Sequence, residues 1–237
     1  LNPVLEALRA RRNIKEVYIS SGRHEKLFLI KKETESRGIA LRIVDVAFFN
    51  ERFPKGHQGI AVKVSEKGYM DLYELLNIPE KRNEIPFFLI LDCIEDPGNV
   101  GAILRSADAA GVHGVIVQEH RSAGLSPAVS KASAGAVEYV PVSQVSNIKH
   151  AISEMKEREI TIIGAESGSG NMPWDVDFSV PAGIVIGSEG RGLRKTVAEK
   201  CDFVVSIPMR GRVNSLNVSA ASAVLMFEVL RQRVRKN

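Results

Sequence analysis

Three stretches of the chain combine polar and glycine residues at spacings that could hold a ligand. In the first, residues 96–105, Pro97-Gly98 predicts a turn, Asn99 an N-cap, and Arg105 follows in the same predicted helix. The start of a helix exposes backbone N–H groups, which suits the binding of an anion. By itself, this stretch is better explained as a capped helix that carries a surface arginine.

The second stretch, residues 187–193, follows an apolar run and contains Gly187, Gly190 and Gly192. Glycines let the backbone approach a ligand closely. Their G-x-x-G-x-G spacing differs from the dinucleotide-binding pattern, and the Gly-Lys-Ser/Thr of a P-loop does not follow. The glycines alone are explained at least as well by a tight turn.

The third stretch, residues 207–219, is the most informative. Arg210 and Arg212 flank a glycine, which predicts a basic loop suited to phosphates. One short polar residue at the head of a helix is explained by capping. Here three of them are interleaved with apolar residues, which favours a binding site over a structural role: Ser215, Asn217 and Ser219.

The elements around these stretches predict an α/β fold. Apolar runs at residues 87–91, 114–117, 160–163, 183–186 and 203–207 are typical of strands that are covered on both faces. Helical patterns separate them, which predicts a mostly parallel sheet with helices on both faces. Ligands bind such sheets at the carboxyl ends of the strands, where the three stretches lie.

The first part of the chain has a different organisation. Residues 1–68 alternate short helices and strands and predict a small α/β domain. Residues 69–85 are rich in charge and proline around one short predicted helix, and we expect a linker there. Residues 86–237 then form the second domain.

Composition limits the partners and cofactors. The 237 residues carry a net charge of +4, which favours a polyanionic partner without requiring one. Four basic residues near the N-terminus are candidates for RNA backbone contacts, although a solvated helix face explains them equally well: Arg9, Arg11, Arg12 and Lys15. Two distant cysteines and five scattered histidines predict no metal site. No run is long enough to cross a membrane, and we expect a cytoplasmic protein.

Taken together and in this order, the three stretches resemble the SpoU (TrmH-like) group of the SPOUT RNA methyltransferases. The residues that carry the resemblance are Asn99 with Arg105, the loop from Gly187 to Gly192, and Asn214 to Ser219. The opening residues 2–8 and the His57-Gln58-Gly59 triplet are similar to the RNA-binding domain of the 23S rRNA guanosine-2'-O-methyltransferases in that group.

The resemblance implies a C-terminal trefoil knot, a homodimer with each active site built across the interface, and S-adenosylmethionine as cofactor. It implies a cofactor-binding set of Ala165, Glu166, Gly187, Ile207, Met209, Ser215 and Leu216. It implies a catalytic set of Asn99, Arg105, Glu189, Ser215 and Asn217. Arg210 and Arg212 are expected to contact RNA, and no metal is required.

The reaction implied is attack of a ribose 2'-hydroxyl on an activated methyl group. Arg105 is a poor general base because its guanidinium stays protonated, so we expect it to hold a phosphate and to stabilise the developing alkoxide. The proton would leave to the phosphate, to water or to Glu189. Three alternatives remain: the same chemistry on tRNA, a non-catalytic RNA-binding paralogue, and a nucleotide-dependent oxidoreductase, which the glycine spacing disfavours.

Overall fold

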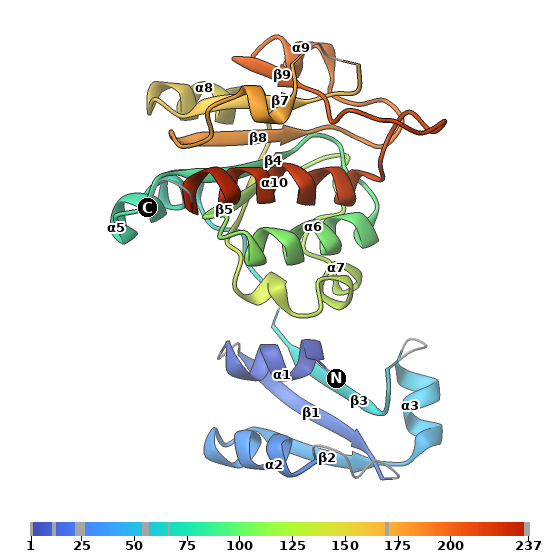
Figure 1. The fold of residues 1–237 in the computed structure, drawn as a ribbon. Coiled ribbons are helices and arrows are strands. Elements are labelled where there is room, and N and C mark those ends of the chain that lie inside the picture. The colour runs from blue at the N-terminus through green and yellow to red at the C-terminus, as the bar shows by residue number, and fades with distance from the viewer. Residues whose placement is uncertain are drawn as a thin grey trace.

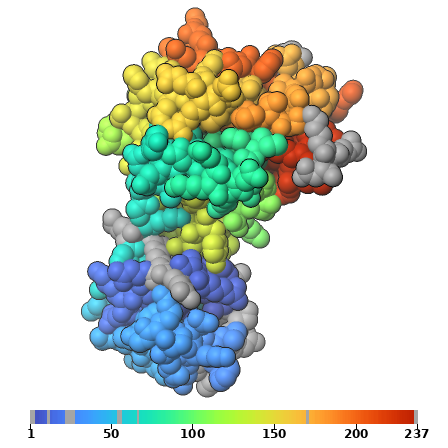
Figure 2. All heavy atoms as spheres, turned by 90° about the vertical axis from the view of Figure 1, so that its left-hand side faces the viewer, coloured from blue at the N-terminus to red at the C-terminus, as the bar shows by residue number. Residues whose placement is uncertain are grey.

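The computed structural model describes residues 2–10, 13–21, 27–53, 57–65, 67–168 and 171–234. Over these residues the chain forms a small N-terminal sheet and a larger C-terminal sheet, each with its own helices (Figure 1). Figure 2 shows the N-terminal part, in blue, below the C-terminal part. Within the described residues, no helix combines the length and the apolar character needed to span a bilayer.

The N-terminal sheet has three strands in the order β2-β1-β3. The central strand β1 (Ile14–Ser20) pairs in parallel with β2 (Ala40–Val44) and antiparallel with β3 (Ile60–Val64). The helices are α1 (Asn2–Arg9), α2 (Leu27–Ser36) and α3 (Val46–Arg52). Val17 and Ile19 alternate along β1 onto one face, where they are buried with Leu8 and Ile30.

The C-terminal sheet has six strands in the order β6-β5-β4-β8-β7-β9, and every pair is parallel. The predicted mostly parallel sheet is therefore confirmed. The strands are β4 (Phe87–Leu91), β5 (Gly114–Gln118), β6 (Val142–Val145), β7 (Thr161–Ala165), β8 (Ala182–Ile186) and β9 (Phe203–Val205).

Helices cover both faces of this sheet. One face carries α6 (Pro97–Ala109), α7 (Pro127–Ala132) and α10 (Val218–Val234). Two short 3-10 helices, η1 (Ala136–Glu138) and η2 (Pro173–Asp175), follow α7 and β7 in the chain. The other face carries α4 (Leu72–Leu76), α5 (Ile78–Arg82), α8 (Ile148–Glu157) and α9 (Lys195–Ala198).

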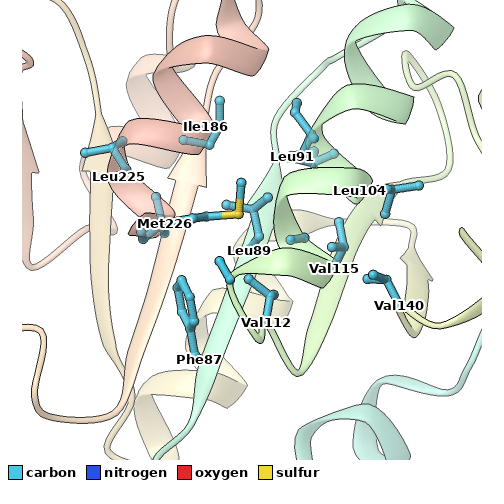
Figure 3. Close-up of a cluster of buried hydrophobic side chains, with 14 of the residues drawn as sticks. Phe87, Leu89, Leu91, Leu104, Val112, Val115, Val140, Ile186, Leu225 and Met226 are labelled. Carbon is cyan, nitrogen blue, oxygen red and sulfur yellow. The ribbon is translucent and has the colours of Figure 1, made fainter. Parts of the chain in front are cut away.

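Alternate residues of β4 explain why the strand is apolar throughout. Phe87, Leu89 and Leu91 point into the core beneath α6 and α10, where they meet Leu225 and Met226 (Figure 3). Phe88 and Ile90 point to the opposite face and are buried with residues of α8. A strand that is buried on both faces of the sheet is apolar at every position, because neither face contacts water.

The segment that the sequence predicted as a linker packs on the C-terminal sheet instead. Leu75 and Leu76 of α4 are buried with Phe88, and Met70 forms a bridge to Ser143 of β6. The charged residues that favoured a linker lie on the exposed side of these helices. The segment is as charged as its composition indicates, but the burial of two leucines makes residues 70–82 part of the C-terminal core.

The two parts of the chain touch through a few polar contacts. The Tyr139 hydroxyl donates to the Glu6 carboxylate of α1 at 2.6 Å, which raises the pKa of Tyr139 to about 12. The Lys67 ammonium donates to the carbonyl oxygens of Val137, within η1, and Val140, just after it. These contacts attach the N-terminal part to the C-terminal part at η1.

Candidate active site

The three stretches meet at the carboxyl ends of the central strands. Residues 92–99 follow β4, residues 187–194 follow β8, and residues 206–217 connect β9 to α10. Strands β4 and β8 are direct neighbours, and the Asp92 N–H donates to the Ile186 carbonyl just beyond the last ladder pair. This adjacency brings together two loops that are about ninety residues apart in sequence. Their different colours in Figure 1 show this separation along the chain.

One residue from each stretch contributes to a hydrogen-bonded polar cluster. The side-chain amide N–H of Asn217 donates to the side-chain amide oxygen of Asn99 at 3.0 Å and to the Glu189 carboxylate at 3.2 Å. The Asn99 amide donates to the second oxygen of Glu189 at 3.3 Å. A carboxylate that accepts from two amides is an acceptor held in one orientation. We call Asn99, Glu189 and Asn217 the amide–carboxylate cluster.

The predicted N-cap role of Asn99 is wrong. Helix α6 begins at Pro97, and the Asp96 carboxylate caps it by accepting the Asn99 N–H at 2.7 Å. Proline suits the first helical position, because that position needs no N–H donor. With Asp96 as the cap, the Asn99 side chain is available for the cluster.

Helix α10 begins at Val218, three residues after Ser215, where the sequence predicted the head of the helix. The side-chain amide oxygen of Asn217 accepts from the Ser219 N–H at 2.9 Å and from the Ser219 hydroxyl at 2.6 Å. This local turn fixes the Asn217 side chain, so that its amide group points to the cluster. Ser215 lies in the preceding loop rather than in the helix.

A cavity of about 530 Å³ lies beside the cluster, at the ends of β7, β8 and β9. We call it the first cavity. All seven residues of the expected cofactor set line it: Ala165, Glu166, Gly187, Ile207, Met209, Ser215 and Leu216. Asn214, from the third stretch, also lines it. Sequence reasoning did not single out Ser167 or Leu225, which line it too, because neither belongs to an unusual sequence pattern.

The glycine loop forms one wall of the first cavity and is a tight turn as well. Ser188 and Gly192 exchange two backbone hydrogen bonds at 2.9 and 3.1 Å. A Cβ added to Gly187 would lie 2.1 Å from the Gly192 carbonyl carbon, closer than any side chain allows. Gly190 and Gly192 have φ of +84° and +66°, a region that favours glycine. The sequence offered two explanations for these glycines, a tight turn and a wall close to a ligand, and this loop is compatible with both.

A second cavity of about 580 Å³ lies on the other side of the glycine loop. Its lining includes Asn99 and Glu189 of the cluster, together with the ends of the loops that follow β4 and β5. Ser188, Glu189, Arg191, Gly192 and Val218 line both cavities.

Arg105 is not brought to this site within one chain. Its side chain is exposed on α6, lies in the wall of neither cavity, and forms no hydrogen bond or ion pair with another described residue. Arg210 and Arg212 are exposed in the loop before α10.

Of the N-terminal basic residues, Arg9 forms an ion pair with Glu6 at 2.8 Å and Lys15 is exposed. Arg11 and Arg12 lie outside the described residues.

A buried ion pair below the glycine loop was missed by sequence reasoning. Asp92 is fully buried at the end of β4, and it accepts from the Arg194 guanidinium at 2.7 Å and from the Arg194 N–H at 3.0 Å. Arg194 also donates to the Gln118 side chain at 2.7 Å. An aspartate directly after an apolar strand was the available signal, and the pair joins the ends of β4, β5 and β8.

The cysteines and acidic groups give no sign of metal chemistry among the residues that the structure describes. No three His, Cys, Asp or Glu side chains gather there in a way that could hold an ion. Burial raises the pKa of the Cys201 thiol to about 12 and also raises that of Cys93, so neither is a thiolate at neutral pH.

Two family models match this chain. The model of the SpoU rRNA Methylase family matches residues 86–227, and the model described as RNA 2'-O ribose methyltransferase substrate binding matches residues 1–70. Among relatives, the TrmH-family protein YacO of Bacillus subtilis is 39% identical over 236 residues, covering 98% of this chain and 94% of the relative. A TrmH-family protein of Staphylococcus saprophyticus is 44% identical over 177 residues, covering 75% of this chain and 71% of the relative.

Solved structures agree with this assignment. The SpoU methyltransferase AviRb of Streptomyces viridochromogenes in complex with AdoMet has a TM-score of 0.82 at 25% identity, covering 98% of this chain and 88% of that one. The TrmH/SpoU tRNA modifying enzyme of A. aeolicus has a TM-score of 0.58 at 29% identity, covering 70% of this chain and 83% of that one. The chain belongs to the SpoU rRNA methylase family, within the TrmH-like RNA methyltransferases.

Proposed function

We propose that this protein transfers a methyl group from S-adenosylmethionine to the 2'-hydroxyl of a guanosine in 23S rRNA. The observation that carries the proposal is the position of the amide–carboxylate cluster against the first cavity. Asn99, Glu189 and Asn217 come from three separate loops and meet beside a space of about 530 Å³, which is of the size that small-molecule cofactors occupy.

The residues of the first cavity fit S-adenosylmethionine. Ile207, Leu216 and Leu225 provide apolar wall for a purine, while Glu166 provides a carboxylate for hydroxyl or amino groups. Gly187 leaves no room for a side chain, so the backbone itself forms the wall there. When bound, the cofactor supplies a methyl group that its positively charged sulfur activates.

The protein's own contribution is to orient the ribose. Asn99 and Asn217 both donate to the carboxylate of Glu189, which lines both cavities, while Asn99 lines the second. A 2'-hydroxyl placed there meets a fixed acceptor in Glu189 for its proton, with phosphate and water as the other possible acceptors. Alignment of this kind lowers barriers by roughly 7–11 kcal/mol in ideal cases.

We propose further that two copies assemble into a homodimer and that Arg105 of one copy completes the site of the other. The exposure of Arg105 outside both cavities supports this. So does an apolar strip on α10, where Val224 and Phe227 are 44% and 46% exposed. Helix α6 runs alongside α10 (Figure 1), so a partner that covers the strip would lie next to Arg105.

A trefoil knot in the C-terminal part remains part of the proposal. The sheet order, in which β8 lies between β4 and β7, supports it, as does the whole-chain similarity to SpoU structures. Arg210 and Arg212 would contact RNA from the loop before α10.

The choice of rRNA over tRNA rests on the N-terminal domain. We propose residues 1–68 as the RNA-binding domain and residues 86–237 as the methyltransferase domain, on whose sheet residues 70–82 pack. The tRNA modifying enzyme matches only 70% of this chain, and the family model for RNA 2'-O ribose methyltransferase substrate binding matches residues 1–70. Arg9 and Lys15 would contact the RNA backbone, with Arg11 and Arg12. An rRNA substrate would place the protein in the cytoplasm.

Ribose-methylation mapping by mass spectrometry tests the proposal. Ribosomal RNA and tRNA are compared from cells with and without this protein, and from in vitro reactions with purified protein and S-adenosylmethionine. We expect one 2'-O-methylguanosine in 23S rRNA that depends on the protein. A site confined to tRNA would favour the second substrate class, and no change in either RNA would favour a non-catalytic paralogue.

A further inference from the structure

The second cavity contains two arginines that the proposed function does not use. Arg121, in the loop after β5, and Arg191, in the glycine loop, both line it. Neither forms a hydrogen bond or an ion pair with any other residue that the structure describes. Arg194 also lines this cavity, but the buried Asp92 carboxylate neutralises its charge. Two guanidinium groups are therefore available to an anionic ligand.

The position of this cavity indicates which ligand that would be. Asn99 of the amide–carboxylate cluster is in its wall, and it shares five residues with the first cavity: Ser188, Glu189, Arg191, Gly192 and Val218. A molecule bound there would lie next to the methyl donor, with the cluster between them. A group that receives a methyl has to lie beside the donor, and the second cavity meets this condition if the first cavity holds the donor.

The charges of the wall fit a nucleotide rather than a simple anion. Besides the arginines, the cavity is lined by the carboxylates of Glu95, Asp96 and Glu189. Asp96 is engaged as the cap of α6 and Glu189 accepts from the cluster, whereas Glu95 is exposed beside them. A nucleotide in RNA offers both partners: phosphates for guanidinium groups, and N–H donors on the base for a carboxylate.

The backbone of the same cavity is held in an unusual conformation. Cys93 and Arg121 have φ of +60° and +56°, a region that side chains other than glycine seldom adopt, and both line this cavity. Residues of this kind tend to lie at ligand sites, because the surrounding structure has to offset their conformational cost. Beneath them, the pair of Asp92 and Arg194 ties the neighbouring loops together.

We propose that the second cavity binds the nucleotide that carries the target ribose, with Arg121 and Arg191 on the phosphates that flank it. The inference rests on the proposed function, because the methyl donor is placed in the first cavity. It adds to that function two RNA-contacting residues and the wall against which the target base lies.

The test measures the salt dependence of RNA binding by the full chain. Arg121→Asn and Arg191→Asn remove one charge each, and asparagine tolerates the positive φ at position 121. The matched control is Arg82→Asn on α5, which precedes β4 and so lies at the amino end of that strand, away from the cavity. The probes are an unmodified 23S rRNA transcript and total tRNA, titrated by filter binding over a series of KCl concentrations.

We expect each cavity variant to lower the slope of log affinity against log salt by about 0.7–0.9, the value for one lost phosphate contact. Arg121→Lys should retain the wild-type slope, because the charge is kept. Affinity for S-adenosylmethionine, measured by calorimetry, should change less than twofold in Arg121→Asn, because Arg121 lines only the second cavity. Arg82→Asn should leave the slope unchanged.

Wild-type slopes for both Arg121→Asn and Arg191→Asn would overturn the inference, as would an equal change in Arg82→Asn. The binding measurement needs no turnover, so it separates this inference from the proposed function. Absence of methylation by the wild-type protein would count against the function. A wild-type protein that methylates RNA, with cavity variants that bind like the control, would remove the inference alone.

Discussion

At the scale of single residues, the candidate site depends on three side chains that hold one another. Asn217 donates to both Asn99 and Glu189, so the loss of one side chain leaves the others without a fixed orientation. None of the three is buried, and their order comes from hydrogen bonds rather than from packing. Substitutions here should therefore change activity more than stability.

Asn217→Ala is expected to lower the single-turnover methylation rate by about 10²–10³-fold, as the loss of one oriented polar group does in other enzymes. The affinity for S-adenosylmethionine should be nearly unchanged. Asn147→Ala is the control, since Asn147 also accepts a helix N–H, that of Lys149, but lies at the start of α8. An equal loss of rate in both variants would mean that Asn217 acts only as a helix cap.

Arg105→Lys tests whether an arginine geometry is needed. Lysine keeps the charge but cannot form the planar fork that holds a phosphate and a developing alkoxide. We expect a single-turnover rate at least about tenfold lower, which is about 1.4 kcal/mol of barrier. The pH–rate profile should keep its shape, because arginine does not act as the base. Near-wild-type rates with an unchanged profile would remove any special role for Arg105.

At the scale of elements, the glycine loop and the β4–β5 connection each make a separate prediction. The loop has to pass close to its own backbone, while the connection has to bury a histidine. Gly187 and His113 are each constrained by the groups that surround them in the fold: the Gly192 backbone for Gly187, and the Phe87 N–H and Glu84 carboxylate for His113.

Gly187→Ala should abolish measurable binding of S-adenosylmethionine, a loss of about 100-fold or more. The added Cβ would lie 2.1 Å from the Gly192 backbone, so the loop must open into the first cavity. Gly111→Ala is the control, because Gly111 has φ +71° but no atom within 4 Å of an added Cβ. It should cost about 1 kcal/mol of stability and leave binding unchanged. Calorimetry that finds intact binding in Gly187→Ala would contradict this view of the loop.

His113 gives the fold a pH dependence. Burial lowers the pKa of His113, and the exposed Glu84 carboxylate opposes this only in part. Its Nδ1 accepts from the Phe87 N–H at 3.1 Å, which requires the neutral ring. The unfolded chain therefore binds a proton more readily than the folded one, and the free energy of unfolding should rise with pH through the range around 6.5 and below.

The measurement is urea unfolding between pH 5 and 8 for the wild type and for His113→Asn, whose side-chain oxygen can also accept the Phe87 N–H. The variant should lose part of the dependence between pH 5 and 7. The same dependence in both proteins would assign it to other groups.

At the scale of the whole molecule, the proposed homodimer would bring Arg105 of one copy to the site of the other. The cluster and both cavities belong to a single copy, whereas Arg105 faces outward on α6. The apolar strip of Val224 and Phe227 on α10 would be buried by a second copy in the proposed homodimer.

Mixing two inactive variants tests whether a site is shared. Arg105→Ala and Asn217→Ala copies, refolded or co-expressed together, form mixed dimers in which one of the two sites has both residues intact. With random pairing, about a quarter of the sites are complete, so about a quarter of the wild-type activity should return. Each variant alone should remain inactive. A mixture no more active than its parts would place Arg105 and Asn217 of the same chain in one site.

How much the sequence could predict depends on how local each signal is. The strands of the C-terminal sheet were predictable except β6, because Val142–Val145 is short and Ser143 and Gln144 interrupt its apolar pattern. The three loops were predictable as a group, since each combines unusual residues directly after a strand. The helix start at Pro97 and the buried leucines of α4 were not, because a cap competes with its neighbours and burial depends on what packs alongside.

The sequence by itself determined the parallel sheet, the family and the loops that hold the polar residues, because alternation, apolar runs and motif order are properties of neighbouring residues. Only the tertiary structure decided that Glu189 meets Asn99 and Asn217, that a second cavity opens beside Arg121, and that Arg105 faces away from both. These depend on the strand order β5-β4-β8-β7. That order is set by burial of the whole sheet between two layers of helices, which no single stretch of sequence encodes.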